Sequence, residues 1–266
     1  AQELQCNFNM SGETVFHPED MELIESLLCE PKYKTGFDRN LWIWEEHTLG
    51  STYMISADVA RGDGQDYSAF HVFKLETSEI VAEYKGKPTP DIFADILFQA
   101  GKEFGDCMLV VENNSVGWGV LSKLEERAYP NLYYSRKSTH EHVETYQAET
   151  TGVIPGFTTS SKTRPLVISK LEELIRNKLI NIKSRRLYNE MKTFIWDNGK
   201  PQAMKKHNDD LIIACAIGCW VKETAFTINQ RAVEYKKAFL TSMTSTSTEL
   251  NTSIPGMLAY KKKEKN

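Results

Sequence analysis

Two apolar, strand-like runs that each end on a carboxylate constrain the fold of this chain more than any other feature. The segment STYMISADVA, residues 51–60, reaches Asp58, and the run MLVVE stops at Glu112. Both runs have the side chains of strands buried in a sheet, where an acid is disfavoured and its charge is costly to bury unless it is paired or bound to a metal. For either residue alone, an acid that simply leads from a strand into a loop is the commoner explanation.

A third acidic point stands at the start of the most apolar helix that the sequence predicts. Asp209 and Asp210 precede the run LIIACAIGCWV, where an N-cap and a favourable helix dipole would also explain them. Three acidic points, each at the end of a buried element, together indicate a site, because open sheets carry their sites at strand ends. Asp66, across a glycine-rich turn from Asp58, could flank that site. His207 could be a base or a phosphate contact, or simply a histidine at a helix start.

Clustered carboxylates predict a divalent metal centre. Like charges repel one another, and a hard cation relieves that repulsion. Mg²⁺ is held by one or two carboxylates together with waters and phosphate, and two such ions about 3.5–4 Å apart stabilise in-line cleavage of a phosphodiester. We therefore expect Asp58, Glu112 and the Asp209-Asp210 pair to bind Mg²⁺ or Mn²⁺, as a pair of ions, for phosphodiester chemistry.

The order of the expected elements describes a mixed sheet with helices on its faces. A meander of strands leads and alternating helices and strands follow, an arrangement typical of α/β proteins. Pro90 and Gly105 mark the two ends of the first expected helix. In chain order we expect an edge strand at 41–47, strands at 51–60, 67–76 and 78–87, a helix at 89–105, a strand at 106–114, a helix at 117–130 and a strand at 131–137.

The remaining elements follow a polar stretch. We expect an amphipathic helix that runs into a short strand over residues 162–184, and then a short helix and a turn at Asn198-Gly199 within residues 185–207. A buried helix over residues 208–224, capped by Asn208 or Asp209, completes the pattern.

Composition shifts suggest how the chain is divided. We expect residues 1–50 to be a lead-in and residues 51–240 to form the main domain, with an inserted polar loop or hairpin at 138–161. Residues 241–266 are rich in Ser and Thr and end in YKKKEKN, which predicts a disordered tail. The chain opens in mid-pattern without an initiator Met, so we interpret it as a fragment of a longer protein.

Composition and cysteine usage exclude several classes of protein. With 41% hydrophobic and 26% charged residues the chain has a soluble globular composition, and its longest apolar run is too short to span a bilayer. The five cysteines show no metal-binding spacing, so we interpret Cys215 and Cys219 as core thiols in a reducing compartment. No GxxxxGK[ST] phosphate loop is present.

The distribution of charge indicates one basic face on an otherwise acidic protein. The formal net charge is −4, yet residues 160–206 contain 12 Lys and Arg against 4 Asp and Glu. Lys and Arg bind phosphates independently of base sequence, although ordinary solvated surface residues would give the same skew. The candidate phosphate contacts in and near this segment are Arg136, Lys137, Lys162, Arg164, Lys183, Arg185, Arg186, Lys205 and Lys206.

Three motifs carry a resemblance to a known family. DVARGDGQDYSAFHVF, VVENNSVGWGVLSKL and HNDDLIIACAIGCW, in this order, resemble the nuclease domain of the large terminases of tailed phages, particularly the T-even-like kind. The resemblance implies an α/β, ribonuclease H-like fold of the resolvase/integrase type, a mixed β-sheet with helices on both faces. It makes Asp58, Glu112 and one aspartate of the Asp209-Asp210 pair the metal-binding catalytic triad, with Asp209 favoured, and Asp66 an accessory acid.

The resemblance also implies an activity and partners. These terminases are metal-dependent endonucleases that cut concatemeric double-stranded DNA during genome packaging into the prohead. Implied partners are double-stranded DNA, the portal protein, the small terminase subunit and an N-terminal ATPase domain of the same polypeptide that is absent from this chain; no membrane is involved. The protein would act in the cytoplasm of the infected bacterial host and transiently at the prohead portal. Residues 156–159 (GFTT) and 162–165 (KTRP) match a region close to DNA.

Two alternative functions stay open from the sequence. One is a different nuclease on the same fold, such as a junction resolvase or a ribonuclease H, which substrate preference would identify. The other is a non-catalytic module that binds DNA and docks on the portal, against which the three intact acidic points argue.

Overall fold

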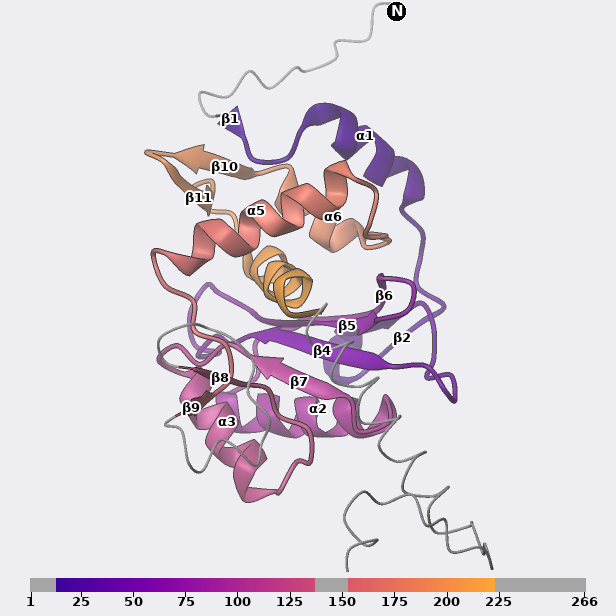
Figure 1. The fold of residues 1–266 in the computed structure, drawn as a ribbon, viewed down its shortest axis with the longest axis vertical. Helices are drawn as coiled ribbons and strands as arrows, with labels where there is room; N and C mark the ends of the chain where they lie inside the picture. Colours follow the sequence, from indigo (N-terminus) through magenta and orange to yellow (C-terminus); the bar gives the residue numbers. More distant parts are fainter. Residues whose placement is uncertain (1–12, 137–152, 223–266) are drawn as a thin grey trace, which may run out of the picture. The chain divides into compact units, whose positions relative to one another are not determined.

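A mixed six-stranded sheet forms the centre of the fold (Figure 1). In the computed structural model, which describes residues 13–136 and 153–222, its strand order is β2-β3-β6-β5-β4-β7. The strands β4 and β7 are parallel, and every other neighbouring pair is antiparallel. Their bounds are β2 Tyr33–Thr35, β3 Leu41–Ile43, β4 Tyr53–Asp58, β5 Ser68–Lys74, β6 Glu79–Gly86 and β7 Met108–Val111.

Two helices cover one face of this sheet. The helix α2 (Pro90–Glu103) carries the chain from β6 across to β7, and α3 (Gly117–Glu126) follows β7. Alternate side chains of β4, including Ile55 and Ala57, join the core cluster that also contains Phe93 of α2 and Leu121 of α3. The crossover helix is what allows β4 and β7 to run parallel.

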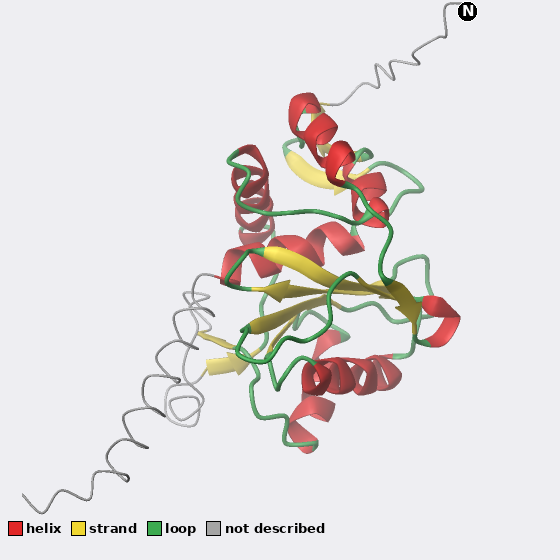
Figure 2. Ribbon diagram, turned by 90° about the vertical axis from the view of Figure 1, so that its right-hand side faces the viewer, coloured by secondary structure: helices red, strands yellow, loops and turns green. Residues whose placement is uncertain are grey.

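A buried helix over residues 210–222, called helix 210–222 below, covers the opposite face. Figure 2 shows helices on both sides of the strands. The Ser56 hydroxyl donates a hydrogen bond of 2.6 Å to the carbonyl of Ala214. A Cβ on Gly218 would lie 2.3 Å from Cε2 of Phe73, so this helix packs directly on the sheet. Asp58 has the same strand parity as Ser56, so it projects toward the face that helix 210–222 covers.

The remaining elements pack around helix 210–222. The helices α5 (Thr163–Arg176) and α6 (Arg185–Met191) lie beyond it from the sheet (Figure 1). A small antiparallel sheet has the order β1-β10-β11, with β10 and β11 joined at Asn198 and Gly199, both at positive φ. The other bounds are β1 Glu13–Thr14, α1 Pro18–Leu27, η1 Phe37–Arg39, β8 Tyr134–Arg136, β9 Val153–Pro155, β10 Phe194–Asp197 and β11 Lys200–Ala203.

The structure confirms most of the predicted elements. The strand meander, the first two helices, the strand before Glu112, the turn at Asn198-Gly199 and the buried helix after Asp209 all lie where the sequence placed them. Cys215 and Cys219 are buried free thiols, as predicted. Among the described residues, no helix combines the length and apolar character needed to cross a membrane.

The structure differs from the prediction at three strands. The predicted edge strand at 41–47 is β3, which is not an edge because β2 pairs with its free side. The predicted strand at 131–137 is β8, which pairs with β9 in a separate sheet and leaves only Leu132 bridged to Leu109. The short strand predicted at the end of residues 162–184 does not form, and Asn181 makes only an isolated bridge to Glu79. The partners of β8 and of Asn181 are distant in sequence, and β2 is a three-residue strand with little pattern of its own, so no local pattern specified these contacts.

The described residues cover only some of the expected domain divisions. Residues 33–43, expected in the lead-in, supply β2 and β3 of the central sheet. Most of the expected insertion at 138–161 and the whole expected tail at 241–266 lie outside the described residues, and the end of the insertion contains β9.

The close packing of helix 210–222 on the sheet gives a first prediction. We expect Gly218→Ala to destabilise the protein by about 1–3 kcal/mol, because the added methyl overlaps Phe73 and Ser56. The matched control is Gly119→Ala in α3, where a Cβ meets no atom within 4 Å, and which should stabilise by up to about 1 kcal/mol. Urea denaturation measures both, and equal effects would contradict the packing argument.

Candidate functional site

Asp58 and Glu112 lie side by side at the carboxyl ends of the parallel strands β4 and β7. The Glu112 N–H donates to the carbonyl of Ala57 at 2.9 Å, which continues the strand register one residue beyond β7. The two carboxyl groups are hydrogen-bonded to each other. Burial, followed by the charge and hydrogen bond of Glu112, raises the pKa of Asp58 well above its usual range, and Asp210 and Asp209 raise it further. These acids therefore share one electrostatic environment.

The connection after β7 holds Glu112 in place. A Cβ on Gly117 would lie 1.8 Å from the Glu112 carbonyl oxygen, so only glycine lets α3 begin this close to the strand. The Asn114 amide donates to Glu112 Oε1 and to the Thr159 carbonyl, each at 2.9 Å. Glu112 is only 8% exposed, so these contacts limit where its carboxylate can point.

The GFTT segment, residues 156–159, lies beside this connection. The Phe157 N–H donates to Val111 O at 2.8 Å, and the Asn113 N–H donates to Phe157 O at 2.9 Å. The Thr158 hydroxyl donates to the Asn113 side chain at 2.9 Å. The Thr159 hydroxyl is buried and has no hydrogen-bond partner among the described residues. The segment thus forms one wall of the candidate site.

Asp209 and Asp210 have different surroundings although they are neighbours. Asp209 Oδ2 accepts hydrogen bonds from Arg164 at 2.5 Å and from the Ala203 N–H at 3.3 Å. Asp210 is only 6% exposed, and its Oδ2 has no hydrogen-bond partner among the described residues. Burial raises the pKa of Asp210 to about 6; the Tyr67 N–H and Lys85 oppose the shift, and Asp209 and Asp66 add to it. Asp210 is therefore the acid with an uncommitted buried oxygen.

The two accessory candidates lie at the margin of the site. Asp66 is exposed and close enough to Asp210 to raise its pKa. His207 is exposed in the loop that leads into helix 210–222, and it lines an open cleft of about 450 Å³ together with Tyr67, Lys85 and Asn208. Both remain accessible to a ligand bound next to Asp210.

The structure sorts the basic candidates into groups. Arg164 pairs with Asp209, Lys162 is exposed at the start of α5, and Lys205 and Lys206 are exposed in the loop before His207. Those four lie around the acids. Arg185 is exposed on α6, Arg136 ends β8, and Lys137 lies outside the described residues.

Arg186 and Lys183 have other roles. The Arg186 guanidinium donates to the Glu83 carboxylate at 2.7 Å and to the carbonyls of Asn40 and Glu83, and it lies 3.9 Å from the centre of the Trp42 ring. Every branch of it is engaged within the protein, so we remove Arg186 from the candidate phosphate contacts. Lys183 pairs with Glu79, at the end of β6 farthest from the acids.

The acids have the chemistry to bind a divalent cation, but in this structure their carboxylates do not converge on one position. Among residues 13–136 and 153–222, no three His, Cys, Asp or Glu side chains are arranged to hold a metal ion. Asp58 and Glu112 are hydrogen-bonded to each other, and Asp209 is turned toward Arg164. The unsatisfied oxygen of Asp210 and the raised pKa of Asp58 both indicate an excess of negative potential that a cation would relieve.

Sequence reasoning missed three residues that support the acids. Asn114 orients Glu112, Lys85 opposes the raised pKa of Asp210, and Glu190 accepts hydrogen bonds from the first amides of helix 210–222. For Asn114 the available signal is its position two residues after Glu112 in the sequence. The only signal for Glu190 is that it is an acid within the basic segment 160–206.

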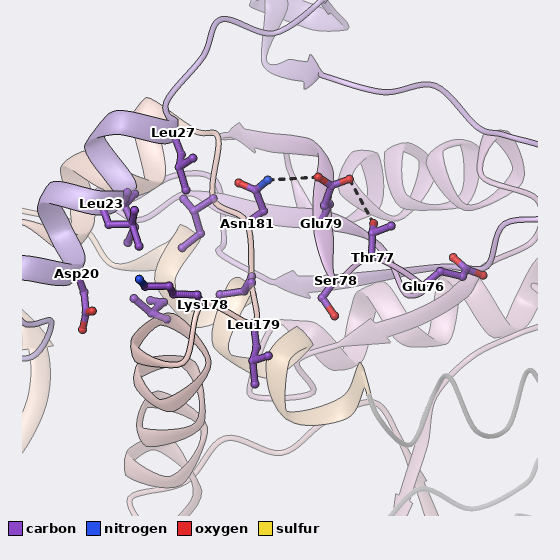
Figure 3. A pocket seen from close by; sticks show the side chains of 14 residues that line it. Asp20, Leu23, Leu27, Glu76, Thr77, Ser78, Glu79, Lys178, Leu179 and Asn181 are labelled. Carbon is purple, nitrogen blue, oxygen red and sulfur yellow. Dashed lines mark hydrogen bonds between the residues drawn. The ribbon is translucent and has the colours of Figure 1, made fainter.

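A second cavity, of about 470 Å³, lies at the other end of the sheet (Figure 3). Leu23 and Leu27 of α1 and Leu179 line it with the turn between β5 and β6, where Asn181 and Thr77 donate to the Glu79 carboxylate. None of the candidate acids borders it. Its lining combines aliphatic side chains with Asp20, Glu76 and Glu79, and it is separate from the candidate site at the strand ends.

Comparison with solved structures gives the fold a family context. No protein-family model matches the chain. The magnesium-bound crystal structure of the large terminase nuclease from thermophilic phage G20c is similar, with a TM-score of 0.59 and 17% identity, and the match covers 79% of this chain and 97% of that one. The nuclease domain of the large terminase from Thermus phage P74-26 has a TM-score of 0.54 at 17% identity, covering 74% and 92%.

The same G20c nuclease is also similar in its cobalt-bound form, with a TM-score of 0.59, and in its zinc-bound form, with a TM-score of 0.52. At these identities the likeness concerns the fold. The chain has the fold of the large terminase nucleases, and the predicted ribonuclease H-like α/β class is confirmed.

The raised carboxyl pKa values predict a pH dependence of stability. Asp210 has a folded pKa of about 6 against an ordinary value near 4, so the folded state binds more protons than the unfolded state between these pH values. In EDTA the free energy of unfolding should therefore fall as pH rises from about 4 to about 6. Between these pH values the Asp210→Asn variant should lose about 1–3 kcal/mol less unfolding free energy than the wild type, as measured by urea denaturation.

A control for this prediction is Asp95→Asn on α2. Asp95 pairs with Lys123 and Arg127 away from the site, so its replacement should leave the loss of stability in EDTA unchanged. A wild-type protein that gained stability over the same pH range would contradict the proposed excess of negative charge.

Proposed function

We propose that this chain is the nuclease domain of a phage large terminase, a metal-dependent endonuclease that cuts concatemeric double-stranded DNA during genome packaging. The observation that carries the proposal is the meeting of Asp58, Glu112 and Asp210 at one edge of the sheet. The fold shared with two phage terminase nucleases, one of them solved with magnesium, supports it.

Asp58, Glu112 and Asp210 are the residues that would hold the metal. A bound pair of divalent ions would neutralise the acids and stabilise the attacking and leaving oxygens of the phosphodiester. The solved G20c nucleases contain magnesium, cobalt or zinc, which supports a divalent ion; Mg²⁺ or Mn²⁺ and the number of ions are part of our proposal.

We propose Asp210, rather than Asp209, as the essential acid at the third position. The Tyr67 N–H holds the Asp210 carboxylate and leaves Oδ2 uncommitted in a buried site. Asp209 is already neutralised by Arg164. In this arrangement Asp209 holds Arg164 and the start of α5 next to the site, and Asp210 supplies the negative charge that would bind the metal.

The surrounding residues orient the acids and bind the backbone of the substrate. Asn114 holds Glu112, and the GFTT segment beside it contains the buried Thr159 hydroxyl, which has no hydrogen-bond partner among the described residues. Lys162, Lys205 and Lys206 are exposed around the acids and would contact phosphates without reading bases. Such contacts suit an enzyme that cuts DNA of many sequences.

The wider assignments rest on the sequence motifs. The proposed partners are double-stranded DNA, the portal protein, the small terminase subunit and an ATPase domain of the same polypeptide. The proposed place of action is the cytoplasm of the infected bacterial host and, transiently, the prohead portal.

Cleavage assays on acid variants test the proposed function. We expect Asp58→Asn, Glu112→Gln and Asp210→Asn to lower plasmid cleavage in Mg²⁺ or Mn²⁺ by about a hundredfold or more, because each removes a proposed ligand charge. Asp209→Asn should cost less than about tenfold, because Asp209 contacts Arg164 instead. Circular dichroism would verify that each variant is folded.

The controls separate the alternatives. Asp95→Asn on α2 should cleave as the wild type does. Cleavage restricted to four-way junctions or RNA–DNA hybrids would favour another ribonuclease H-like nuclease. DNA binding without any metal-dependent cleavage, in this chain and in the full-length protein, would favour a non-catalytic module.

The exposed lysines beside the acids predict a salt-dependent contact with DNA. Replacing Lys205 and Lys206 together by Ala should reduce the slope of log affinity against log salt by about 1.8, since each lost phosphate contact contributes about 0.9. Fluorescence anisotropy with a duplex at several salt concentrations measures the slope. The matched double variant at Lys32 and Lys34, on the β2 edge, should leave it unchanged.

A further inference from the structure

The helix that carries Asp210 is capped by a residue from another element. The first amides of a helix have no acceptor within it, and a residue at the N-cap usually supplies one. Asp209 occupies that position, but its Oδ2 contacts Arg164 and Ala203 instead. The acceptor is Glu190 of α6, whose Oε2 receives the N–H groups of Leu211 at 2.9 Å and Ile212 at 3.3 Å.

Glu190 is buried and is held from its other side. It is 7% exposed, and its Oε1 pairs with the ammonium of Lys85 from β6. Lys85 also lies 4.5 Å from the centre of the Tyr67 ring, and the Tyr67 N–H donates to Asp210. Asp210 is thus connected to Glu190 by two routes. One runs along the first residues of helix 210–222, and the other runs through Tyr67 and Lys85.

We propose that Glu190, held by Lys85, is a positioning residue that fixes the start of helix 210–222 and thereby places Asp210 for metal binding. This inference rests on the proposed function. The amides that Glu190 holds belong to the two residues after Asp210, so any shift of this helix end moves the Asp210 carboxylate directly. Ligand side chains must stay within about 0.5 Å of a productive position, which a supporting residue of this kind provides.

Glu190 is not proposed as a ligand itself. Its two oxygens already accept from three donors, Lys85, Leu211 and Ile212. A carboxylate has about four acceptor positions, so little capacity remains for a cation. Its role is therefore carried by its hydrogen bonds to the helix, which an amide oxygen can also accept.

Two measurements on Glu190→Ala test this inference. In metal-free protein, hydrogen exchange resolved by NMR should be at least about tenfold faster at the amides of Leu211 and Ile212, because they lose their acceptor. Mn²⁺ binding by the folded variant, measured by calorimetry without DNA, should be about tenfold weaker or more, the usual cost of losing a supporting residue.

Glu190→Gln and Glu45→Ala are the matched variants. Glu190→Gln keeps an acceptor oxygen, so its Mn²⁺ affinity should stay within about threefold of the wild type. Glu45→Ala breaks the comparable pair of Glu45 with Lys74, and it should leave both measurements unchanged. Lys74 has the opposite strand parity to Phe73, the residue of β5 that packs on helix 210–222.

Each outcome bears on a different statement. Unchanged exchange in Glu190→Ala would overturn the cap whether or not the protein binds metal. Faster exchange with unchanged Mn²⁺ affinity would overturn the positioning role and leave a purely structural one. Equal losses in the Gln and Ala variants would show that the charge of Glu190 is required, through its pair with Lys85 or as a ligand, and that its hydrogen bonds to the helix are not sufficient, which also overturns the proposal. Wild-type protein that binds no Mn²⁺ would refute the proposed function, and the exchange measurement would still decide the cap.

Discussion

The parallel pairing of β4 with β7 is the constraint on which the candidate site depends. Parallel neighbours end at the same edge of a sheet, so the acids that follow the two apolar runs meet there. The pairing requires the crossover helix α2, and it fixes the register in which the Glu112 N–H contacts Ala57. The close start of α3 at Gly117 and the adjacent GFTT segment then enclose Glu112 from the remaining sides.

Gathering acids at this edge has an electrostatic cost that the fold only partly offsets. Arg164 neutralises Asp209, and Lys85 with the Tyr67 N–H lowers the cost of ionising Asp210. Burial raises the pKa of Asp58, and the neighbouring charge of Glu112, which the Asn114 amide holds in place, raises it further. A folded protein tolerates such strain at functional sites, where a ligand of opposite charge removes it. These electrostatics support the proposed binding of a cation at the site.

Local patterns predicted the elements well and their pairing less well. The runs that became β4, β5, β6 and β7 are apolar enough to be read directly, and Pro90 marks the start of α2. The placement of β3 inside the sheet depends on β2, a strand of three residues with little pattern of its own. The separate pairing of β8 depends on β9, which follows the undescribed residues 137–152. Such pairings are set by tertiary packing more than by the pattern of the strand itself.

The sequence by itself indicated the α/β class and the candidate acids, because the order of its apolar runs predicts a mixed sheet and three of the predicted elements begin or end on a carboxylate. The tertiary structure alone decided how those acids are used. Asp209 precedes the helix as its N-cap and Asp210 is the first helical residue, so their side chains leave the backbone in different directions. Asp209 meets Arg164 while Asp210 keeps a buried oxygen without a partner among the described residues, a difference that adjacent letters cannot express. Packing likewise decided that Arg186 pairs with Glu83 and that Glu190 caps a helix. A charged group that is removed from water needs a partner, and only the tertiary structure determines which partner lies nearby.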